Sequence, residues 1–257
     1  LTKYIKDYQM IYLKGIKMKP SKKATAKRKR NPLVTKLLNL KYRINDTAKE
    51  EGWSDDMSTD NTVDVIRKTI LGDDRFILIE NKQKMYQPGN YDQVIRGLDI
   101  PDDEICVEVD GDDWLPNSNV FGLINETYSD PDVWMTSGSF KYSNGAQGFS
   151  TAPTSFSNIR KQGFTLSHLR TWKSWLWKKI KEEDLKDSDN NYWSVAGDLA
   201  FMFPMFEMSG EKHYRHIPTI TYIYNETNPL NDHKVNMPKV NSTVSIIRNK
   251  QPYELLS

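Results

Sequence analysis

The chain has 257 residues, of which 37% are hydrophobic and 27% charged, and its formal net charge is +2. This length suits one large domain, or a core domain with a smaller addition, and the composition is that of a globular protein. The apolar runs are far shorter than the roughly 20 residues of a membrane span, and a single cysteine excludes a disulfide within the chain. We therefore expect a soluble, cytoplasmic protein.

Positive charge is concentrated near the amino end. Residues 14–30 hold nine Lys and Arg residues and no acid. Such a run can neutralise the phosphates of a nucleic acid or of an anionic surface. The other interpretation is a solvated basic loop, because such runs are often disordered and this one has no aromatic residue to stack on bases.

Helices and strands are expected to alternate up to residue 109. Helical spacing of apolar residues predicts helices at 33–40, at 55–70 with Ser58 or Thr59 as its cap, and at 90–98 with Leu98 facing inward. A buried strand is expected at 76–80 and another strand at 105–109. This order predicts an α/β domain with a mostly parallel central sheet, helices on both faces, and ligand-binding loops at the carboxyl ends of the strands.

Three carboxylates follow the strand at 105–109, and Pro116 fits the first turn of a helix after them. Asp110, Asp112 and Asp113 are hard oxygen ligands of the kind that hold a divalent cation together with phosphate oxygens. An acidic surface turn is the alternative, since Asp-Gly-Asp-Asp is also typical of turns. The pattern indicates a site for a metal ion and a diphosphate.

The carboxyl half is expected to begin with a strand at 133–140 and a long loop at 141–163 that could cover a ligand. A helix over 166–180 is predicted next, with its tryptophans in the core unless one of them packs against a sugar. An apolar helix follows from Gly197, and a last strand lies at 217–224. Of the histidines, His168 has no distinguishing context.

These motifs, taken together, resemble the family 2 glycosyltransferases of the GT-A fold. The segment DDMSTDNT and, about fifty residues later, VDGDDWLPN are similar to two motifs of that family. The blocks HLRTWKSWLWKKI, GDLAFMFPMFEMSG and TYIYNETNPLND resemble a branch frequent in viruses and microbes, so that the likeness covers residues 55–232. Two segments depart from the pattern: MIYLKGI is the only candidate for the first strand, and EEGWS stands where an apolar strand is usual.

The resemblance implies an inverting hexosyl- or pentosyltransferase that depends on Mn²⁺ or Mg²⁺. Its donor would be a nucleoside-diphosphate sugar, with UDP as the expected nucleotide, and its acceptor a hydroxyl of a glycan or glycoconjugate. The compartment would be the cytoplasm of the producing cell or of a virus-infected host. Residues 1–50 would be a basic segment, 51–140 the nucleotide-sugar-binding half, and 141–257 the acceptor-binding and catalytic half.

The resemblance also assigns roles to residues that bind the donor and the metal. Asp55 and Asp56 match the carboxylates near the nucleotide base, although a helix-capping turn would also place them there. Asp110 and Asp112 match the residues near the ribose and metal. The metal ligands would be Asp112, Asp113 and, from a closing carboxyl-terminal loop, His233; Arg170 is a candidate contact to the donor.

Asp198 matches the general base that removes the proton of the acceptor hydroxyl. Its position at a helix start is also what the helix dipole alone would favour, and Glu207 on the same helix is the reserve candidate. Two other functions stay open. The acceptor could be DNA with hydroxylated bases, as the basic segment suggests, or the chain could be a non-catalytic module that binds nucleotide sugars.

Overall fold

The computed structural model describes residues 8–13, 50–73, 76–228, 234 and 236–257. The strands are β1 (Tyr8–Leu13), β2 (Glu50–Asp55), β3 (Phe76–Glu80), β4 (Ile105–Asp110), β5 (Met135–Tyr142), β6 (Thr171–Lys173) and β7 (Tyr214–Tyr224). The helices are α2 (Thr62–Ile70), α3 (Tyr86–Ile95), α4 (Val120–Thr127), η1 (Ile159–Lys161), α5 (Ser174–Lys178), η2 (Glu182–Leu185), α6 (Gly197–His213) and α8 (Met237–Asn249). The helix predicted at 33–40 and the basic run at 14–30 lie outside the described residues.

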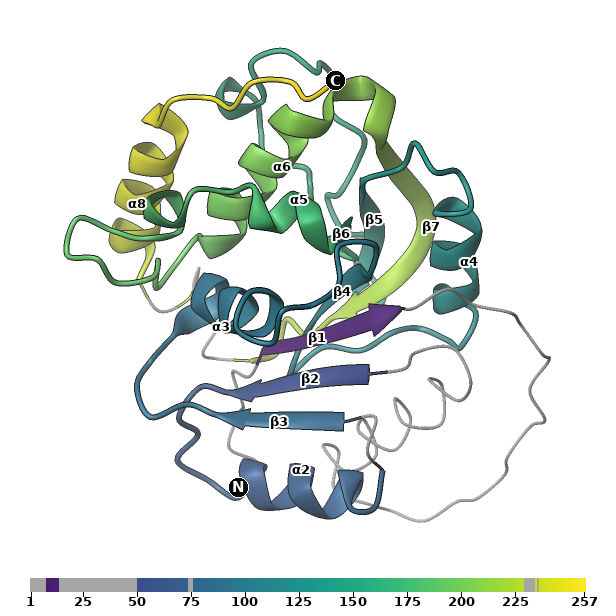
Figure 1. Ribbon diagram of the computed structural model, residues 1–257, viewed down its shortest axis with the longest axis vertical. Helices are drawn as coiled ribbons and strands as arrows, with labels where there is room; N and C mark the ends of the chain where they lie inside the picture. Colours follow the sequence, from purple (N-terminus) through teal and green to yellow (C-terminus); the bar gives the residue numbers. More distant parts are fainter. Residues whose placement is uncertain (1–7, 14–49, 74–75, 229–233, 235) are drawn as a thin grey trace.

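The described strands form one sheet in the order β3-β2-β1-β4-β6-β5-β7 (Figure 1). Strands β2, β3, β4, β5 and β7 point in one direction, whereas β1 and β6 run against their neighbours. The expected mostly parallel sheet is therefore found in the direction of the strands. In pairing the sheet is mixed, because β1 and β6 each lie between two opposed strands.

The shared direction brings the carboxyl ends of the main strands to one edge of the sheet. Ser54 of β2 and Asp110 of β4 both lie opposite Tyr8 of β1. Asn81, just after β3, donates its backbone N–H to the carbonyl of Asp55 at 3.0 Å. The two acidic clusters of the sequence thus lie at the same edge, as predicted from the alternation of helices and strands.

The two segments that depart from the family pattern provide two central strands. MIYL belongs to β1 and EEGWS to β2, and these strands pair with each other in an antiparallel register. Strand β1 also pairs with β4. The amino-terminal segment therefore completes the middle of the sheet, between β2 and β4.

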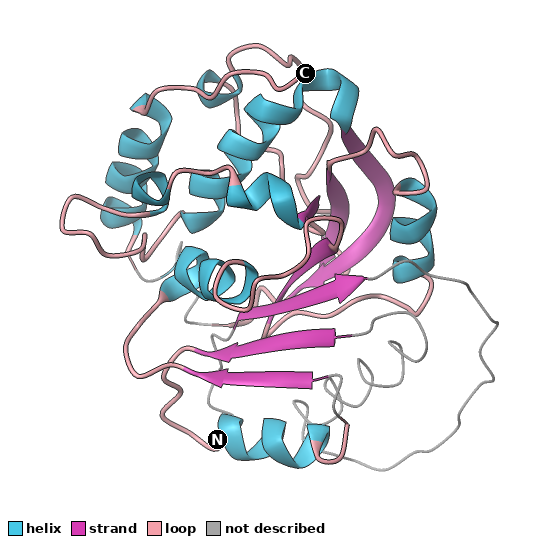
Figure 2. Ribbon diagram, viewed as in Figure 1, coloured by secondary structure: helices cyan, strands magenta, loops and turns pink. Residues whose placement is uncertain are grey.

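Helices cover both faces of the sheet (Figure 2). Helices α3, α5, α6 and α8 share one buried cluster with Cys106 of β4, and α2 and α4 share the other with Val107 and Val109 of the same strand. Successive side chains of β4 point to opposite faces, as the pleat of a strand requires. Glu108 thus points to the same face as Cys106, toward α3 and α6, and it is fully buried there.

The predicted helix over 166–180 is wrong. Its periodic apolar residues are all buried, but residues 171–173 form β6, which pairs with β4 and β5, and only residues 174–178 are helical. The spacing misled because buried positions on a short strand and a following turn of helix also recur every three or four residues. Trp172 and Trp177 are in the core, as predicted.

Four other details differ from the sequence prediction. Helix α2 begins at Thr62, so that neither Ser58 nor Thr59 caps it, and α4 begins four residues after Pro116. Leu98 lies beyond the end of α3 and is 41% exposed. Strand β3 is partly exposed, because it is the edge strand of the sheet.

Candidate active site

Arg170 joins two carboxylates that come from different elements. One terminal nitrogen of its guanidinium donates to Glu108 Oε1 at 2.7 Å, and the other donates to Asp198 Oδ2 at 2.8 Å. Its Nε donates to the carbonyl of Leu166 at 3.1 Å. The side chains of Arg170 and Glu108 are buried, whereas that of Asp198 is 23% exposed. The guanidinium therefore fixes the one carboxylate of this chain that solvent can reach.

Asp198 occupies the place that the sequence predicts, in the first turn of α6. Its Oδ1 accepts the backbone N–H of Leu199 at 3.0 Å while its Oδ2 accepts Arg170. A carboxylate in the first turn of a helix also interacts favourably with the helix dipole. The two hydrogen bonds hold the side chain in a defined orientation, which a positioned general base requires.

A second group of polar side chains meets beneath this ion pair. Ligand atoms of Glu108, Asp110 and His168 lie within 4.8 Å of one another. Among the described residues, one buried atom of each has no hydrogen-bond partner: Glu108 Oε2, Asp110 Oδ1 and His168 Nδ1. Buried polar atoms without partners are unusual in native structures and can indicate a bound ion. We call these three residues the inner group.

Burial determines the charge state of the inner group. It raises the pKa of Asp110 well above the ordinary value, and the neighbouring carboxylates Glu108, Asp113 and Asp112 add to this rise. It also raises the pKa of Glu108, although Arg170 opposes the shift. Burial, with a smaller contribution from Arg170, holds the pKa of His168 well below its usual value. His168 is therefore neutral, which is the form that can bind a metal ion.

Asp112 and Asp113, the predicted metal ligands, contact the segment that follows β7. Asp112 Oδ2 accepts the side-chain amide of Asn228 at 2.5 Å, and Asp113 Oδ1 accepts the backbone N–H of Asn225 at 2.7 Å. These bonds join the end of β4 to the segment in which His233 was predicted as a ligand. His233 itself lies outside the described residues.

Asp55 and Asp56 lie buried at the end of β2, on the same edge as Asp110. Asp55 accepts the backbone N–H of Ser58 at 3.3 Å. Asp56 accepts the backbone N–H groups of Met85 and Tyr86 at 2.8 and 3.1 Å. Asp56 thus fixes the loop before α3, and its predicted contact to the nucleotide base stays a prediction.

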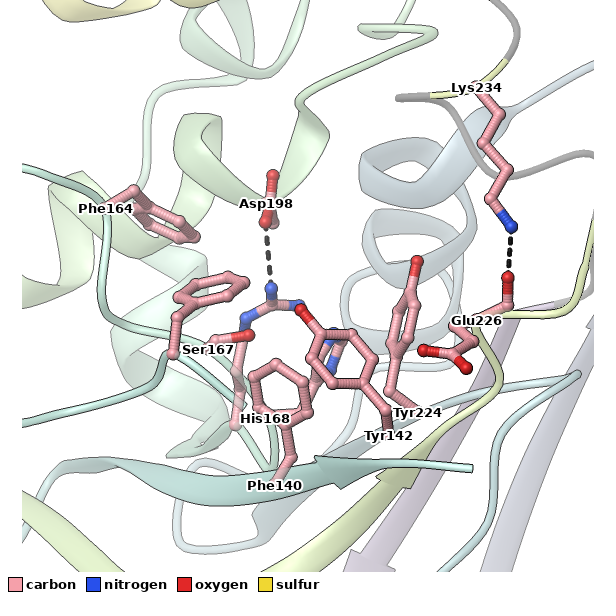
Figure 3. Close-up of a pocket in the computed structure, with 11 residues that line it drawn as sticks. Phe140, Tyr142, Phe164, Ser167, His168, Asp198, Tyr224, Glu226 and Lys234 are labelled. Atoms are coloured by element: carbon pink, nitrogen blue, oxygen red, sulfur yellow. Dashed lines mark hydrogen bonds and ion pairs between the residues drawn. The ribbon is translucent and has the colours of Figure 1, made fainter. Parts of the chain in front are cut away.

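A cavity of about 710 Å³ opens beside Asp198 and Arg170 (Figure 3). Its lining combines aromatic rings with a few polar groups: Phe140, Tyr142, Phe149, Phe164, Ser167, His168, Arg170, Asp198, Tyr224, Glu226 and Lys234. Figure 3 shows the Asp198 carboxylate facing the rings of Phe140, Tyr142 and Tyr224 across this space. Asp198 can therefore contact a molecule bound between these rings.

Glu207, the reserve candidate for the base, has a different setting. It forms a two-pronged ion pair with the buried Arg160, at 2.6 and 2.9 Å, and it accepts the backbone N–H of Tyr253 at 2.9 Å. It does not line the cavity. These contacts connect α6 to η1 and to the carboxyl-terminal tail, which is a structural role.

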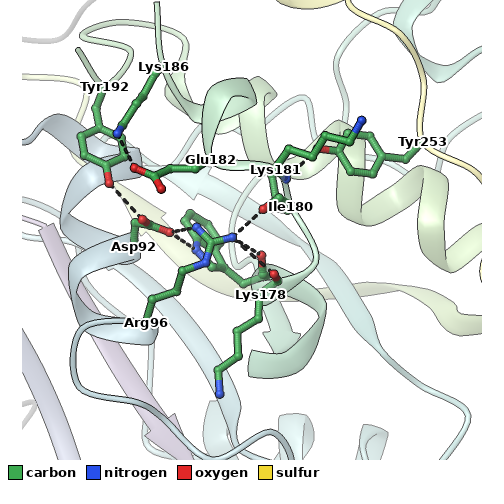
Figure 4. Close-up of polar contacts among 10 residues, drawn as sticks. Asp92, Arg96, Lys178, Ile180, Lys181, Glu182, Lys186, Tyr192 and Tyr253 are labelled. Carbon is green, nitrogen blue, oxygen red and sulfur yellow. Dashed lines mark hydrogen bonds and ion pairs between the residues drawn. The ribbon is translucent and has the colours of Figure 1, made fainter. Parts of the chain in front are cut away.

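Helix α3 contributes to the site through Gln87, whose side-chain amide donates to Glu108 Oε1 at 2.7 Å. Polar contacts around Asp92 fasten this helix to α5 (Figure 4). Asp92 accepts the indole N–H of Trp177 at 2.8 Å and the hydroxyl of Tyr192 at 2.9 Å. Arg96 binds Asp92 and donates to carbonyls at the end of α5. The position of Gln87 is therefore set from outside the site.

Sequence reasoning identified Asp198, Arg170 and the acids after β4, and the structure brings them together at one edge of the sheet. It did not identify Glu108 or His168. A charged residue inside the alternating apolar run of β4 is a usable signal for Glu108, because a buried charge needs a partner. For His168 the sequence holds no comparable signal, since its burial against Tyr222, with ring centroids 4.4 Å apart, arises from tertiary packing.

No protein-family model matches the chain, and no curated protein sequence does. Solved structures do match. TarS of S. aureus superposes with a TM-score of 0.53 at 15% identity, over 76% of this chain and 34% of TarS. A structure of TarS residues 1–349 gives a TM-score of 0.52 at 18% identity, over 87% of this chain and 64% of that one.

A second solved protein with a similar fold is a mannosyltransferase. PcManGT from Pyrobaculum calidifontis, in complex with GDP-Man and Mn²⁺, superposes with a TM-score of 0.53 at 15% identity, over 88% of this chain and 64% of that one. This chain thus spans about a third of TarS and less than two thirds of the other two structures. In the described part of the chain, none of the helices has the length and apolar character needed to cross a membrane. The chain has the α/β fold of the GT-A type that these glycosyltransferases share.

Proposed function

We propose that this protein is a metal-dependent glycosyltransferase. It transfers a sugar from a nucleoside-diphosphate sugar, of the UDP class, to a hydroxyl of a glycan or glycoconjugate, with inversion at the anomeric carbon. One observation carries the proposal: in a fold of the GT-A type, the partly exposed carboxylate of Asp198 faces a cavity beside the acids at the end of β4. In support, solved structures with a similar fold hold UDP-GlcNAc in TarS, and GDP-Man with Mn²⁺ in PcManGT.

The proposed chemistry places Asp198 at the acceptor. Its carboxylate accepts the proton of the acceptor hydroxyl while that oxygen forms a bond to the anomeric carbon. The bond from the anomeric carbon to the diphosphate oxygen breaks on the opposite face, and the nucleoside diphosphate leaves with the bonding electrons. Arg170 keeps the carboxylate in place through its 2.8 Å contact. Residues 51–140 then provide the donor side and residues 141–257 the acceptor side.

The acids at the end of β4 fit a divalent cation. The inner group offers two carboxylates and a neutral imidazole, with three buried atoms that have no partner among the described residues. The predicted ligands Asp112 and Asp113 would bind the ion by exchanging contacts that they make to Asn228 and Asn225. Mn²⁺ or Mg²⁺ held here would neutralise the charge that develops on the leaving diphosphate.

Thermal unfolding in the presence of nucleotide sugars tests the proposal. A UDP-sugar at 100 times its dissociation constant should stabilise the protein by about 2.7 kcal/mol, and we expect this only with Mn²⁺ or Mg²⁺ present. The Asp198→Asn variant should be stabilised to the same extent, because Asp198 is assigned to the acceptor. If no nucleotide sugar raises the melting temperature with either ion, the chain is not a glycosyltransferase of this kind.

A second assay separates an enzyme from a module that only binds. With donor, metal and a mixture of glycan acceptors, the wild-type protein should release nucleoside diphosphate, and Asp198→Asn should release it far more slowly. Donor binding without release by the wild-type protein would support a non-catalytic module instead.

A further inference from the structure

We infer that the cavity beside Asp198 binds a neutral sugar ring of the acceptor, with Phe149 at its mouth as the stacking surface. This inference rests on the proposed function and adds to it the chemical class of the acceptor. It separates a carbohydrate acceptor from DNA, the two classes that the sequence leaves open.

Phe149 is exposed but is held in a defined place. It is 56% exposed, and its ring meets that of Phe140 edge to face, with centroids 5.3 Å apart. The preceding residue, Gly148, donates its backbone N–H to the carbonyl of Phe140 at 2.9 Å. A Cβ at position 148 would lie 2.5 Å from the Phe140 ring, so the close approach requires glycine. The backbone is thus fixed against Phe140, and the ring of Phe149 is presented at the cavity.

The other walls of the cavity are also rings. Tyr142 meets Phe140 and Tyr224 edge to face, with centroids 5.3 and 5.8 Å apart, and Phe164 lines a further side. Aromatic faces are large, rigid and apolar, and they suit the C–H faces of a pyranose ring. The volume of about 710 Å³ is within the range of about 300–1,000 Å³ that is usual for small-molecule sites. The walls therefore match a ring with apolar faces and a polar rim.

The charges of the lining favour a neutral ligand. The lining has two acids, Asp198 and Glu226, and two cations, Arg170 and Lys234. Both cations have partners: Arg170 binds Glu108 and Asp198, and the Lys234 ammonium binds the carbonyls of Glu226 and Asn228. DNA binding relies on cations that neutralise phosphates, and the described lining offers no surplus of positive charge for this purpose.

The position of Asp198 sets the orientation of the bound ring. Its carboxylate faces the rings of Phe140, Tyr142 and Tyr224 (Figure 3). A sugar that packs its C–H face on the aromatic walls can therefore direct a hydroxyl at its edge toward this carboxylate. A few polar groups that fix the orientation within an apolar wall are typical of small-molecule sites.

Binding of two probes to the metal-loaded protein with UDP tests the inference. The first probe is a panel of methyl pyranosides, observed by saturation-transfer NMR, and the second is a single-stranded oligonucleotide that contains 5-hydroxymethylcytosine. We expect at least one pyranoside to bind, and Phe149→Ala to weaken it by roughly threefold to tenfold, the range of one aromatic contact. Phe149→Trp should retain binding.

The matched control is Ile246→Ala, which removes another exposed apolar side chain, 52% exposed, that is not part of the cavity. It should leave pyranoside binding unchanged. Melting curves of the variants confirm that each is folded. The inference is overturned if no pyranoside binds, if Phe149→Ala binds as wild type, or if Phe149→Ala weakens the oligonucleotide and not the sugar. Donor binding, measured separately by thermal shift, tests the proposed function and is expected to be unchanged in Phe149→Ala.

Discussion

The guanidinium of Arg170 lies 2.8 Å from the carboxylate of Asp198 and, through its other terminal nitrogen, 2.7 Å from that of Glu108. The first carboxylate starts a helix, and the second sits inside a central strand. Because Glu108 and Arg170 are buried, this chain of charges cannot be rearranged by solvent. The orientation of Asp198 thus depends on the sheet itself.

The first prediction concerns this dependence. Arg170→Lys keeps the charge but has a single ammonium, which cannot reproduce two separate guanidinium contacts. We expect kcat for transfer to fall while donor affinity stays unchanged, since the donor side lies with other residues. Steady-state kinetics and donor titration measure the two quantities. The control is Arg215→Lys, whose side chain pairs with Asp130 on the surface; equal losses of kcat in both variants would contradict the positioning role.

The second prediction concerns Asp198 itself. Asp198→Asn retains the size of the side chain but cannot take a proton, so transfer should fall by about 10² to 10⁴. If the residue only stabilised the start of α6, the variant would lose about 0.3 to 1 kcal/mol of stability and keep its rate. A melting curve and a transfer assay on the same preparation separate the two roles.

The third prediction concerns the metal ion. His168→Phe can keep the stacking on Tyr222 but removes the nitrogen ligand of the inner group, so we expect Mn²⁺ affinity to fall by about tenfold or more. Asp110→Asn should weaken the ion further. Electron paramagnetic resonance of free Mn²⁺ during a titration measures both. The exposed Asp103→Asn serves as control; loss of binding in Asp112→Asn and Asp113→Asn, but not in His168→Phe, would place the ion on the predicted pair instead.

The fourth prediction separates Glu207 from catalysis. Glu207→Ala leaves the buried Arg160 without its carboxylate partner, and the loss of one member of a buried ion pair costs about 3–5 kcal/mol. We expect a lower melting temperature and an unchanged rate of transfer per folded molecule. A loss of rate as large as that expected for Asp198→Asn, in protein shown to be folded, would make Glu207 the base.

The sequence predicts those parts of the fold and site whose signals are local. The acids after β4 and Asp198 at the start of α6 were located correctly because a strand end and a helix start are recognised from neighbouring residues. The contact of Arg170 with Glu108 joins residues 62 positions apart, and the burial that makes it decisive arises only when β6 inserts between β4 and β5. The failed helix over 166–180 has the same cause, since strand pairing overrode local periodicity there.

The placement of β1 between β2 and β4 has a consequence for how the basic run can be studied. Tyr12 lies directly opposite Glu50, and Leu13 opposite Ile105, so residues 14–49 leave and rejoin the sheet at adjacent positions on the edge away from Asp198. Antiparallel neighbours can be joined by a hairpin turn of only a few residues. Replacement of residues 14–49 by such a turn should therefore preserve the register of the sheet, and would yield a protein without the basic run in which donor binding and acceptor choice can be compared with those of the full chain.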